Sequence, residues 1–161
     1  RAPAASAWAD ELAARLEAVR KRAATYGKRP RVYFEEWPDP MISGIRWVEE
    51  LISVAGGDPI FPELLEKGLA RERIVSADEV ARRSPDLVLA SWCGKKVDVP
   101  SIRARSGWSD VPAVANDRIV ELRSSEILQP GPACLTDGLD AIVEAIDAVV
   151  AGRAVAPRAR R

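Results

Sequence analysis

Three short segments of the chain hold the side chains that suit recognition of a small molecule. They are residues 37–40, 92–96 and 124–129. Each follows an apolar run that predicts a β-strand, so all three are expected at the edge of a sheet where parallel strands end. Ligands bind at that edge in open α/β sheets. The convergence locates a candidate site without identifying its ligand.

Two tryptophans in these segments have alternative roles. Trp37 either anchors its loop or offers an aromatic platform to a ligand. Trp92 follows the last residues of its strand, and we expect it to be exposed. In that position it either contacts a ligand or covers its own loop.

Catalytic chemistry has little support in the sequence. The chain contains no histidine, which removes Ser-His and Cys-His nucleophile pairs and most zinc sites. Glu35 and Glu36 are neighbours in a predicted strand, so they point to opposite faces and cannot act jointly on one atom. The sequence has no glycine-rich phosphate-binding motif. We therefore predict no catalytic residue, no metal site and no cofactor.

The two cysteines leave two alternatives open. Trp92-Cys93-Gly94-Lys95 resembles a thioredoxin-type redox motif, but it lacks the second cysteine that disulfide exchange needs. Cys134 begins the last predicted helix, beside the third segment. The two thiols therefore either form one bridge or remain separate and inert.

Helices and strands alternate around these segments. Apolar spacing and stop signals predict helices over residues 6–26, 40–55, 76–83 and 132–151. Apolar runs predict strands over residues 31–35, 86–91 and 118–122, with short extended pieces at 59–61, 73–75 and 111–116. The alternation predicts one α/β lobe with a central, mostly parallel sheet flanked by helices.

Several polar residues are expected to cap these helices. Ser6 suits an N-cap, and Asp39-Pro40 suits a cap followed by the first helical position. Ser76 and Glu79 form an S-x-x-E capping box, in which Glu79 reaches back to the Ser76 N–H. Asp78 either complements the helix dipole or serves as an exposed acid for a basic partner.

The composition is that of one globular domain. Lys plus Arg and Asp plus Glu both number 24 in 161 residues, so no overall charge favours nucleic acid or acidic lipid. No run approaches the roughly 18 consecutive apolar residues of a membrane span. The first residues show no apolar core of a signal peptide, which leaves the compartment open.

Three sequence blocks, in order and suitably spaced, resemble one family. They are residues 38–61, residues 76–89, and Val111-Pro-Ala-Val followed by Asn116-Asp-Arg-Ile-Val. Together they extend over about residues 30–151 and are similar to the second lobe of the periplasmic substrate-binding proteins that serve ABC importers of iron-siderophore complexes and vitamin B12. Glu36-Trp-Pro-Asp-Pro makes the resemblance stronger toward the cobalamin-binding branch.

The resemblance implies a fold of two Rossmann-like α/β lobes joined by one long helix, with the ligand held in the cleft between them. Residues 1–28 would be the C-terminal part of the interlobe helix, residues 29–152 the C-terminal lobe, and residues 153–161 a basic tail. The first lobe of the family has no counterpart in this sequence, so we expect an exposed cleft face.

By position, the resemblance also implies functional residues. The ligand-binding set is Trp37, Asp39, Trp92, Cys93, Ser125, Glu126 and Gln129. Asp78 falls where the family carries the acid, usually Glu, that docks onto arginines of the membrane permease. The cleft tryptophan that precedes this acid in the family has no counterpart, because Glu72 and Arg73 occupy that region.

The function expected from the resemblance is capture of cobalamin or another corrinoid for an ABC permease, in the periplasm or at the cell surface. The cobalt would arrive inside the ligand. The alternative within the family is haem or a ferric siderophore, which Lys95 and Lys96 would favour if they point into the cleft. From other classes, the alternatives are a small α/β enzyme and an interaction domain without a ligand.

Overall fold

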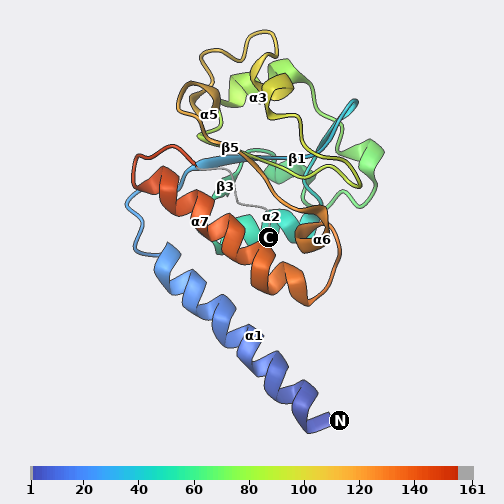
Figure 1. Ribbon diagram of the computed structural model, residues 1–161, viewed down its shortest axis with the longest axis vertical. Coiled ribbons are helices and arrows are strands. Elements are labelled where there is room, and N and C mark those ends of the chain that lie inside the picture. Colours follow the sequence, from blue (N-terminus) through green and yellow to red (C-terminus); the bar gives the residue numbers. More distant parts are fainter. Residues whose placement is uncertain (1, 156–161) are drawn as a thin grey trace.

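The computed structural model describes residues 2–155 of the chain. Figure 1 shows a sheet between two layers of helices, with a long first helix below them. This arrangement confirms the predicted α/β lobe. In the described residues, no helix combines the length and the apolarity that crossing a membrane requires.

The sheet is built around its first strand. Its strands are β1 (Arg31–Pro38), β2 (Met41–Ser43), β3 (Asp58–Pro59), β4 (Leu87–Ala90) and β5 (Ile119–Glu121). The order is β2-β1-β4-β5, and β3 also pairs with β1. The β1–β2 pair is antiparallel, whereas β3, β4 and β5 join in parallel. The sheet is therefore mixed and mostly parallel, as predicted.

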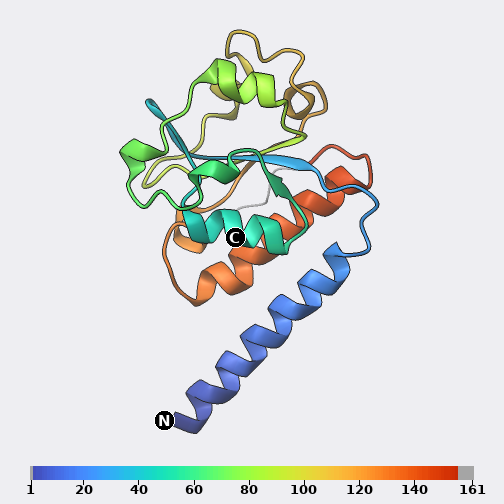
Figure 2. The same ribbon diagram turned by 180° about the vertical axis from the view of Figure 1, so that it is seen from behind.

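One helical layer covers each face of the sheet (Figures 1 and 2). The first layer contains α2 (Arg46–Val54), α6 (Ser124–Ile127), the π-helical segment η3 (Cys134–Gly138) and α7 (Leu139–Val150). The second contains α3 (Ala77–Arg83), α4 (Val99–Arg103) and α5 (Pro112–Ala115). Two short 3₁₀ turns, η1 (Pro62–Leu64) and η2 (Ala70–Glu72), precede α3.

The side chains of β1 point alternately to the two faces of the sheet, so they contribute to two separate core clusters. Val32 and Phe34 belong to the cluster that includes the inner faces of α2 and α7. Tyr33 belongs to the cluster that includes residues of α3, α4 and α5. Successive strand residues point to opposite faces of a sheet. One eight-residue strand therefore contributes to both cores.

The first helix, α1 (Ala2–Ala23), packs on the lobe through its C-terminal half. Leu16 and Val19 lie against the α2–α7 core, and the Tyr26 hydroxyl donates to Asp147 at 2.5 Å. Trp8 is 47% exposed. The predicted N-cap at Ser6 is wrong, because the helix already begins at Ala2.

The second predicted helix begins later than its sequence pattern indicated. Asp39 and Pro40 form the turn between β1 and β2, and α2 begins only at Arg46. The cause is strand pairing: the Ser43 N–H donates to the Arg73 carbonyl, and Ile42 forms a bridge with Ile74. The Gly56-Gly57 stop is confirmed, with Gly56 at a φ of +95°.

Two other segments differ from the prediction. Residues 112–115 form α5 instead of an extended piece, with Pro112 in the first turn. Residues 124–127 form α6 instead of a loop. The last helix does begin near Pro132, although η3 interrupts its regular hydrogen bonding. The predicted basic tail lies outside the described residues from position 156 onward.

Candidate ligand-binding site

The parallel strands bring the three predicted segments to one edge of the sheet. Glu35 of β1 lies opposite Ala90 of β4, and Ala90 lies opposite Glu121 of β5. Each segment begins within a few residues of these positions. The Val97 N–H donates to the Glu121 carboxylate at 3.0 Å, which ties the second segment to the end of β5. The predicted convergence of the three strand ends is confirmed.

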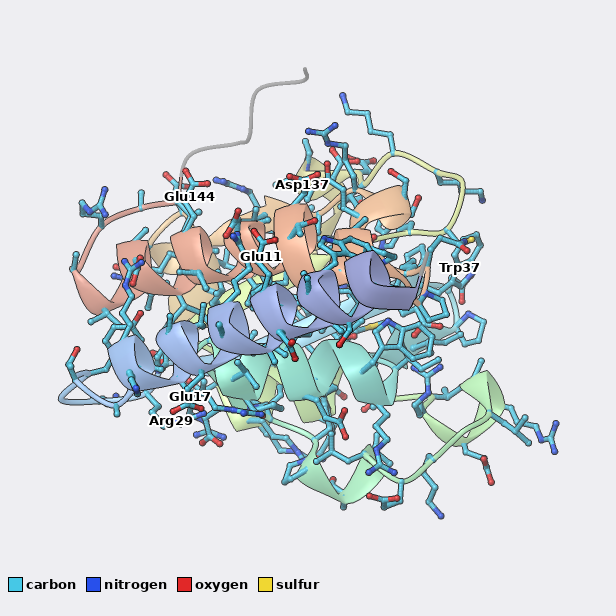
Figure 3. All side chains as sticks on the ribbon, turned by 90° about the horizontal axis from the view of Figure 1, so that it is seen from below. Glu11, Glu17, Arg29, Trp37, Asp137 and Glu144 are labelled. Atoms are coloured by element: carbon cyan, nitrogen blue, oxygen red, sulfur yellow. The ribbon has the colours of Figure 1, made fainter. Side chains whose placement is uncertain are left out.

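Trp37 has an observed structural role in the first segment. Its side chain is half-buried, and its indole N–H donates to the Asp39 carbonyl at 3.0 Å. The Lys95 ammonium lies 4.8 Å from the centroid of the Trp37 ring, a separation typical of a cation–π contact. Asp39 is exposed. Figure 3 shows Trp37 on the side of the molecule toward which the N-terminal end of α1 points.

The predicted exposure of Trp92 is wrong. Its side chain is only 7% exposed, and its indole N–H donates to Glu35 at 3.2 Å. Glu35 is fully buried and accepts two further hydrogen bonds from Arg105, at 2.5 and 2.9 Å. Trp92 therefore anchors the second segment at its start. The side chains that this segment exposes are those of Cys93, Lys95 and Lys96.

A second buried ion pair lies at the end of β1. Glu36 accepts from Arg73 at 2.8 and 3.2 Å, and Arg73 also donates to the Ser43 carbonyl. Arg73 is 1% exposed. These contacts fasten the η2–α3 connection to strands β1 and β2. Glu35 and Glu36 bind different arginines, Arg105 and Arg73, as expected of strand neighbours that point to opposite faces of the sheet.

Glu49, in the first turn of α2, completes this polar region. Burial raises the pKa of its carboxyl to about 8, against the opposing effects of the Gly44 backbone N–H and the Arg73 charge. One of its oxygens has no hydrogen-bond partner in the described part of the chain. At neutral pH, a carboxyl with this pKa is mostly protonated.

The third segment presents a mixture of exposed and buried predicted residues. Ser125 and Gln129 are exposed, whereas Glu126 is buried and pairs with Arg123 at 3.0 Å. The Gln129 carbonyl accepts a hydrogen bond from the Cys134 thiol at 2.7 Å. Only Ser125 and Gln129 of this segment therefore have exposed side chains.

Both cysteines are free thiols. Cys93 is exposed in the second segment, and Cys134 is buried beside the third. The separate-thiol alternative therefore describes this structure. Among the described residues, no three Cys, Asp or Glu side chains are grouped so as to hold a metal ion.

Asp78 lies in the first turn of α3, on the helical layer next to the second segment. The Ser76 hydroxyl accepts from the Glu79 N–H at 3.2 Å, so the predicted N-cap is confirmed. The reciprocal half of the capping box is wrong, because the Glu79 side chain pairs with Arg82 and Arg83. Asp78 is exposed, and no cation of the described residues pairs with it.

Sequence reasoning missed the two arginines that hold this edge. Arg105 and Arg73 lie 70 and 37 positions from their glutamates. The available signal was the Glu35-Glu36 pair at the end of an apolar strand, since a buried carboxylate requires a cationic partner. That signal demands a partner but does not say which of the 24 basic residues supplies it.

The chain resembles a possible iron-binding periplasmic solute-binding protein of Staphylococcus epidermidis, with 21% identity and a TM-score of 0.70 over 85% of this chain and 52% of that one. It also resembles the periplasmic vitamin B12-binding protein of Vibrio cholerae, with 20% identity and a TM-score of 0.65 over 88% and 52% of the two chains. A periplasmic haem-binding protein of Roseiflexus is 26% identical, with a TM-score of 0.64 over 86% and 55%.

The chain thus spans about half the length of these solved structures. No curated protein matches its sequence. A family described as "Periplasmic binding protein" matches residues 1–126, which is more than half of the chain. By this match, the chain belongs to the periplasmic binding protein family.

Proposed function

We propose that this chain is the C-terminal lobe of a solute-binding protein that captures a corrinoid, with cobalamin as the first candidate, and delivers it to an ABC permease. The observation that carries the proposal is the meeting of three segments at one sheet edge in a chain of this family. The family is one of binding proteins, so the enzyme alternative is set aside.

The proposed division of the chain follows from the same reasoning. Residues 1–28 would join this lobe to another, residues 29–152 would form the lobe, and residues 153–161 would be a tail. The solved relatives are about twice as long as the stretch that they share with this chain. A ligand held by the whole protein would then meet this lobe on one side only.

The proposed ligand contacts come from the exposed parts of the three segments. Trp37 offers apolar surface, while Asp39, Ser125 and Gln129 offer polar atoms to the amides of a corrinoid. Trp92 is buried, and in this proposal it acts mainly by holding the segment that exposes Cys93. The buried carboxylate of Glu126 would act in the same indirect way.

One observation favours a second candidate, an anionic ligand such as haem or a ferric siderophore. The Lys95 ammonium lies over the Trp37 ring, and both Lys95 and Lys96 are exposed. No carboxylate of the described residues forms an ion pair with either lysine. A carboxylate, phenolate or phosphate on the ligand would therefore find the Lys95 cation over an aromatic ring and a second exposed lysine next to it in the sequence.

A titration tests the ligand class. Cyanocobalamin, haemin and a ferric siderophore are each added to this chain and to the longest form that its native gene encodes, with binding followed by tryptophan quenching and calorimetry. Tight binding of cyanocobalamin supports the corrinoid proposal. Binding of haemin or the siderophore alone would replace it with the second candidate. No binding of any of them by the longest form would reject both.

A matched pair of variants separates the two candidates. Lys95→Gln should weaken an anionic ligand about fivefold, the effect of losing roughly 1 kcal/mol of exposed charge interaction. Cyanocobalamin affinity should change less. Lys67→Gln removes an exposed lysine of the η1–η2 connection and serves as the control. If Lys95→Gln and Lys67→Gln weaken binding of the anionic ligand equally, the loss of affinity would come from the change in overall charge.

The proposed docking role of Asp78 has its own experiment. Asp78→Arg reverses an exposed charge on α3, and should lower capture of the protein by its detergent-solubilised ABC permease at least tenfold, because a desolvated ion pair would become a repulsive one. Asp58→Arg makes the same change at the opposite edge of the sheet, where β3 begins, and should leave capture unchanged. Undiminished capture of Asp78→Arg would reject the docking assignment.

A further inference from the structure

The two functional regions proposed above lie against the same core cluster. Trp92 starts the second ligand segment, and α3 carries the docking candidate Asp78. Trp92, Trp108 and Val80 of α3 all belong to the cluster on this face of the sheet. A continuous set of hydrogen bonds and ring contacts joins the two regions through that cluster.

The first link runs from the ligand segment to a buried ion pair. The Trp92 indole N–H donates to Glu35 Oε1 at 3.2 Å. Arg105 donates to both oxygens of the same carboxylate, at 2.9 and 2.5 Å. The Glu35 side chain is fully buried and that of Arg105 is 15% exposed, so both charges lie largely out of water.

The second link runs from the ion pair to α3. The Arg105 guanidinium lies 4.8 Å from the centroid of the Trp108 ring. Trp108 is fully buried, and its indole N–H donates at 3.0 Å to the carbonyl of Ala77, the first residue of α3. Asp78 is the next residue. Tyr33 packs edge-on against Trp108 at 6.3 Å and fixes the ring from the sheet side.

These contacts constrain one another because they are buried. Both Glu35 oxygens are occupied, and the indole N–H groups of Trp92 and Trp108 each have one protein acceptor. A displacement of Trp92 or Arg105 would leave a buried charge or donor without its partner, which is costly in a low dielectric. The start of the ligand segment and the first turn of α3 are therefore held in a fixed relation.

We propose that Glu35, Arg105 and Trp108 form a buried relay of positioning residues, through which ligand contact with the segment 92–96 changes how well Asp78 engages the permease. The inference rests on the proposed function, because it requires both a ligand and a permease. It adds to that function a set of buried contacts inside this lobe that couples ligand binding to permease binding. The coupling is reciprocal: permease binding changes ligand affinity by the same factor.

The test measures this coupling factor directly. The longest form of the protein that its native gene encodes is bound to its permease in nanodiscs, with and without saturating cyanocobalamin. Haemin replaces cyanocobalamin if the titration above selects haemin. The ratio of the two permease affinities is the coupling factor, which for coupled sites is typically about 5 to 150. Trp108→Phe removes the indole N–H together with part of the buried ring, and should bring the factor close to 1 while ligand affinity stays within about threefold.

A second relay variant guards against misfolding. Glu35→Gln combined with Arg105→Met removes both charges together, so no buried charge is left unpaired. It should also bring the coupling factor close to 1. The control is Tyr26→Phe, which removes one hydrogen bond of similar kind between residue 26 and Asp147, away from both regions. The control should keep the wild-type factor.

The outcomes distinguish this proposal from the proposed function. A wild-type coupling factor retained in Trp108→Phe and in the double variant overturns the relay and leaves the proposed function intact. A coupling factor of 1 in the wild-type protein also overturns the relay and leaves the proposed function intact. Loss of permease capture in Asp78→Arg, with the factor unchanged in the relay variants, would place the route outside these residues. Absence of ligand binding by the wild type overturns both proposals.

Discussion

Three glutamates near the end of β1 have different environments, although all three are buried or half-buried. Glu35 and Glu36 each share an ion pair with one arginine. Glu49 has no such direct pair, and burial raises its pKa to about 8. An ionised carboxyl without a close cation is disfavoured in a low dielectric. The same side-chain type therefore has an arginine partner at two positions and a raised pKa at the third, within one small region.

Glu49 should make the folded state less stable as the pH rises from about 4.5 to about 8. Its folded-state pKa is raised from 4.5 to about 8. Its contribution to stability is therefore fully present below about pH 4.5 and is lost as the pH rises through about 8. Glu49→Gln mimics the protonated form and should remove this loss. The variant should become more stable than the wild type by up to a few kcal/mol as the pH rises from 5 to 9.

Urea unfolding of both proteins at several pH values measures this difference. The comparison of variant with wild type cancels the contributions of other titrating groups. A difference in unfolding free energy that stays constant from pH 5 to pH 9 would show that Glu49 does not titrate in this range. The pKa of its carboxyl would then not be raised by burial.

The Glu35–Arg105 pair should show strong non-additivity. Arg105→Met alone leaves the Glu35 carboxylate buried and unpaired, and should lower the unfolding free energy by about 3–5 kcal/mol. Adding Glu35→Gln should recover most of that loss, because the remaining groups are neutral. Guanidinium unfolding of the two single variants and the double variant checks this. Simple addition of the single effects would contradict a direct, desolvated pair.

At the scale of elements, α3 depends on its first turn. The Ser76 hydroxyl accepts from the Glu79 N–H, and Arg83 ties the far end of the helix to Glu63 and to the Ile60 carbonyl. Ser76→Ala should lower the unfolding free energy by about 1 kcal/mol. Asp78→Asn should lower it by only a few tenths, since its contribution is an exposed charge–dipole interaction. Urea unfolding separates the two, and equal losses would give Asp78 a structural role beyond the helix dipole.

The elements that could be predicted from the sequence are those with long apolar patterns. The runs before residues 36 and 91, and the apolar stripe of the last helix, indicate burial on their own. The predicted elements are wrong where pairing between strands decides the structure. Asp39-Pro40 resembles a helix start, but the short strand β2 pairs with β1 immediately after it. Four-residue helices such as α5 and α6 have too few residues to show a helical period.

The candidate site was predictable to a similar degree. Its location follows from strand order, because parallel strands end at one edge. The environment of each side chain does not follow. Trp92 is buried because Glu35 points to its face of the sheet and because Arg105, far along the chain, neutralises that glutamate. The local sequence indicates that a buried carboxylate needs a cationic partner, but it does not identify a partner so far along the chain.

At the scale of the whole molecule, two arginines from distant connections fasten β1 at its carboxyl end. Arg105 follows α4 and reaches Glu35, whereas Arg73 follows η2 and reaches Glu36. Both arginines come from connections rather than from the sheet. Such connections are ordinarily mobile in the absence of buried contacts. The two ion pairs preorganise the sheet edge where the three candidate segments begin.

The first helix is fastened along only part of its length. Its C-terminal half contacts the α2–α7 layer, and Leu16 there lines a groove of about 720 Å³ together with Trp47 and Leu135. Its N-terminal half lies away from the lobe, as Figures 1 and 2 show. Short helical segments without tertiary packing are marginal in water. The two halves of α1 should therefore differ in stability within one continuous helix.

Hydrogen exchange on the 161-residue chain tests this difference. Amides of residues 16–23 should exchange slowly, because opening them breaks the contacts of Leu16 and Val19 with the core. Amides of residues 5–12 should exchange much faster, at rates close to those of a fraying peptide helix. Leu16→Ala should extend fast exchange toward residue 23 and leave the strands of the sheet protected. Uniform protection along α1 would mean that its N-terminal half is covered in solution, for instance by a second copy of the chain, and a concentration series would reveal that association.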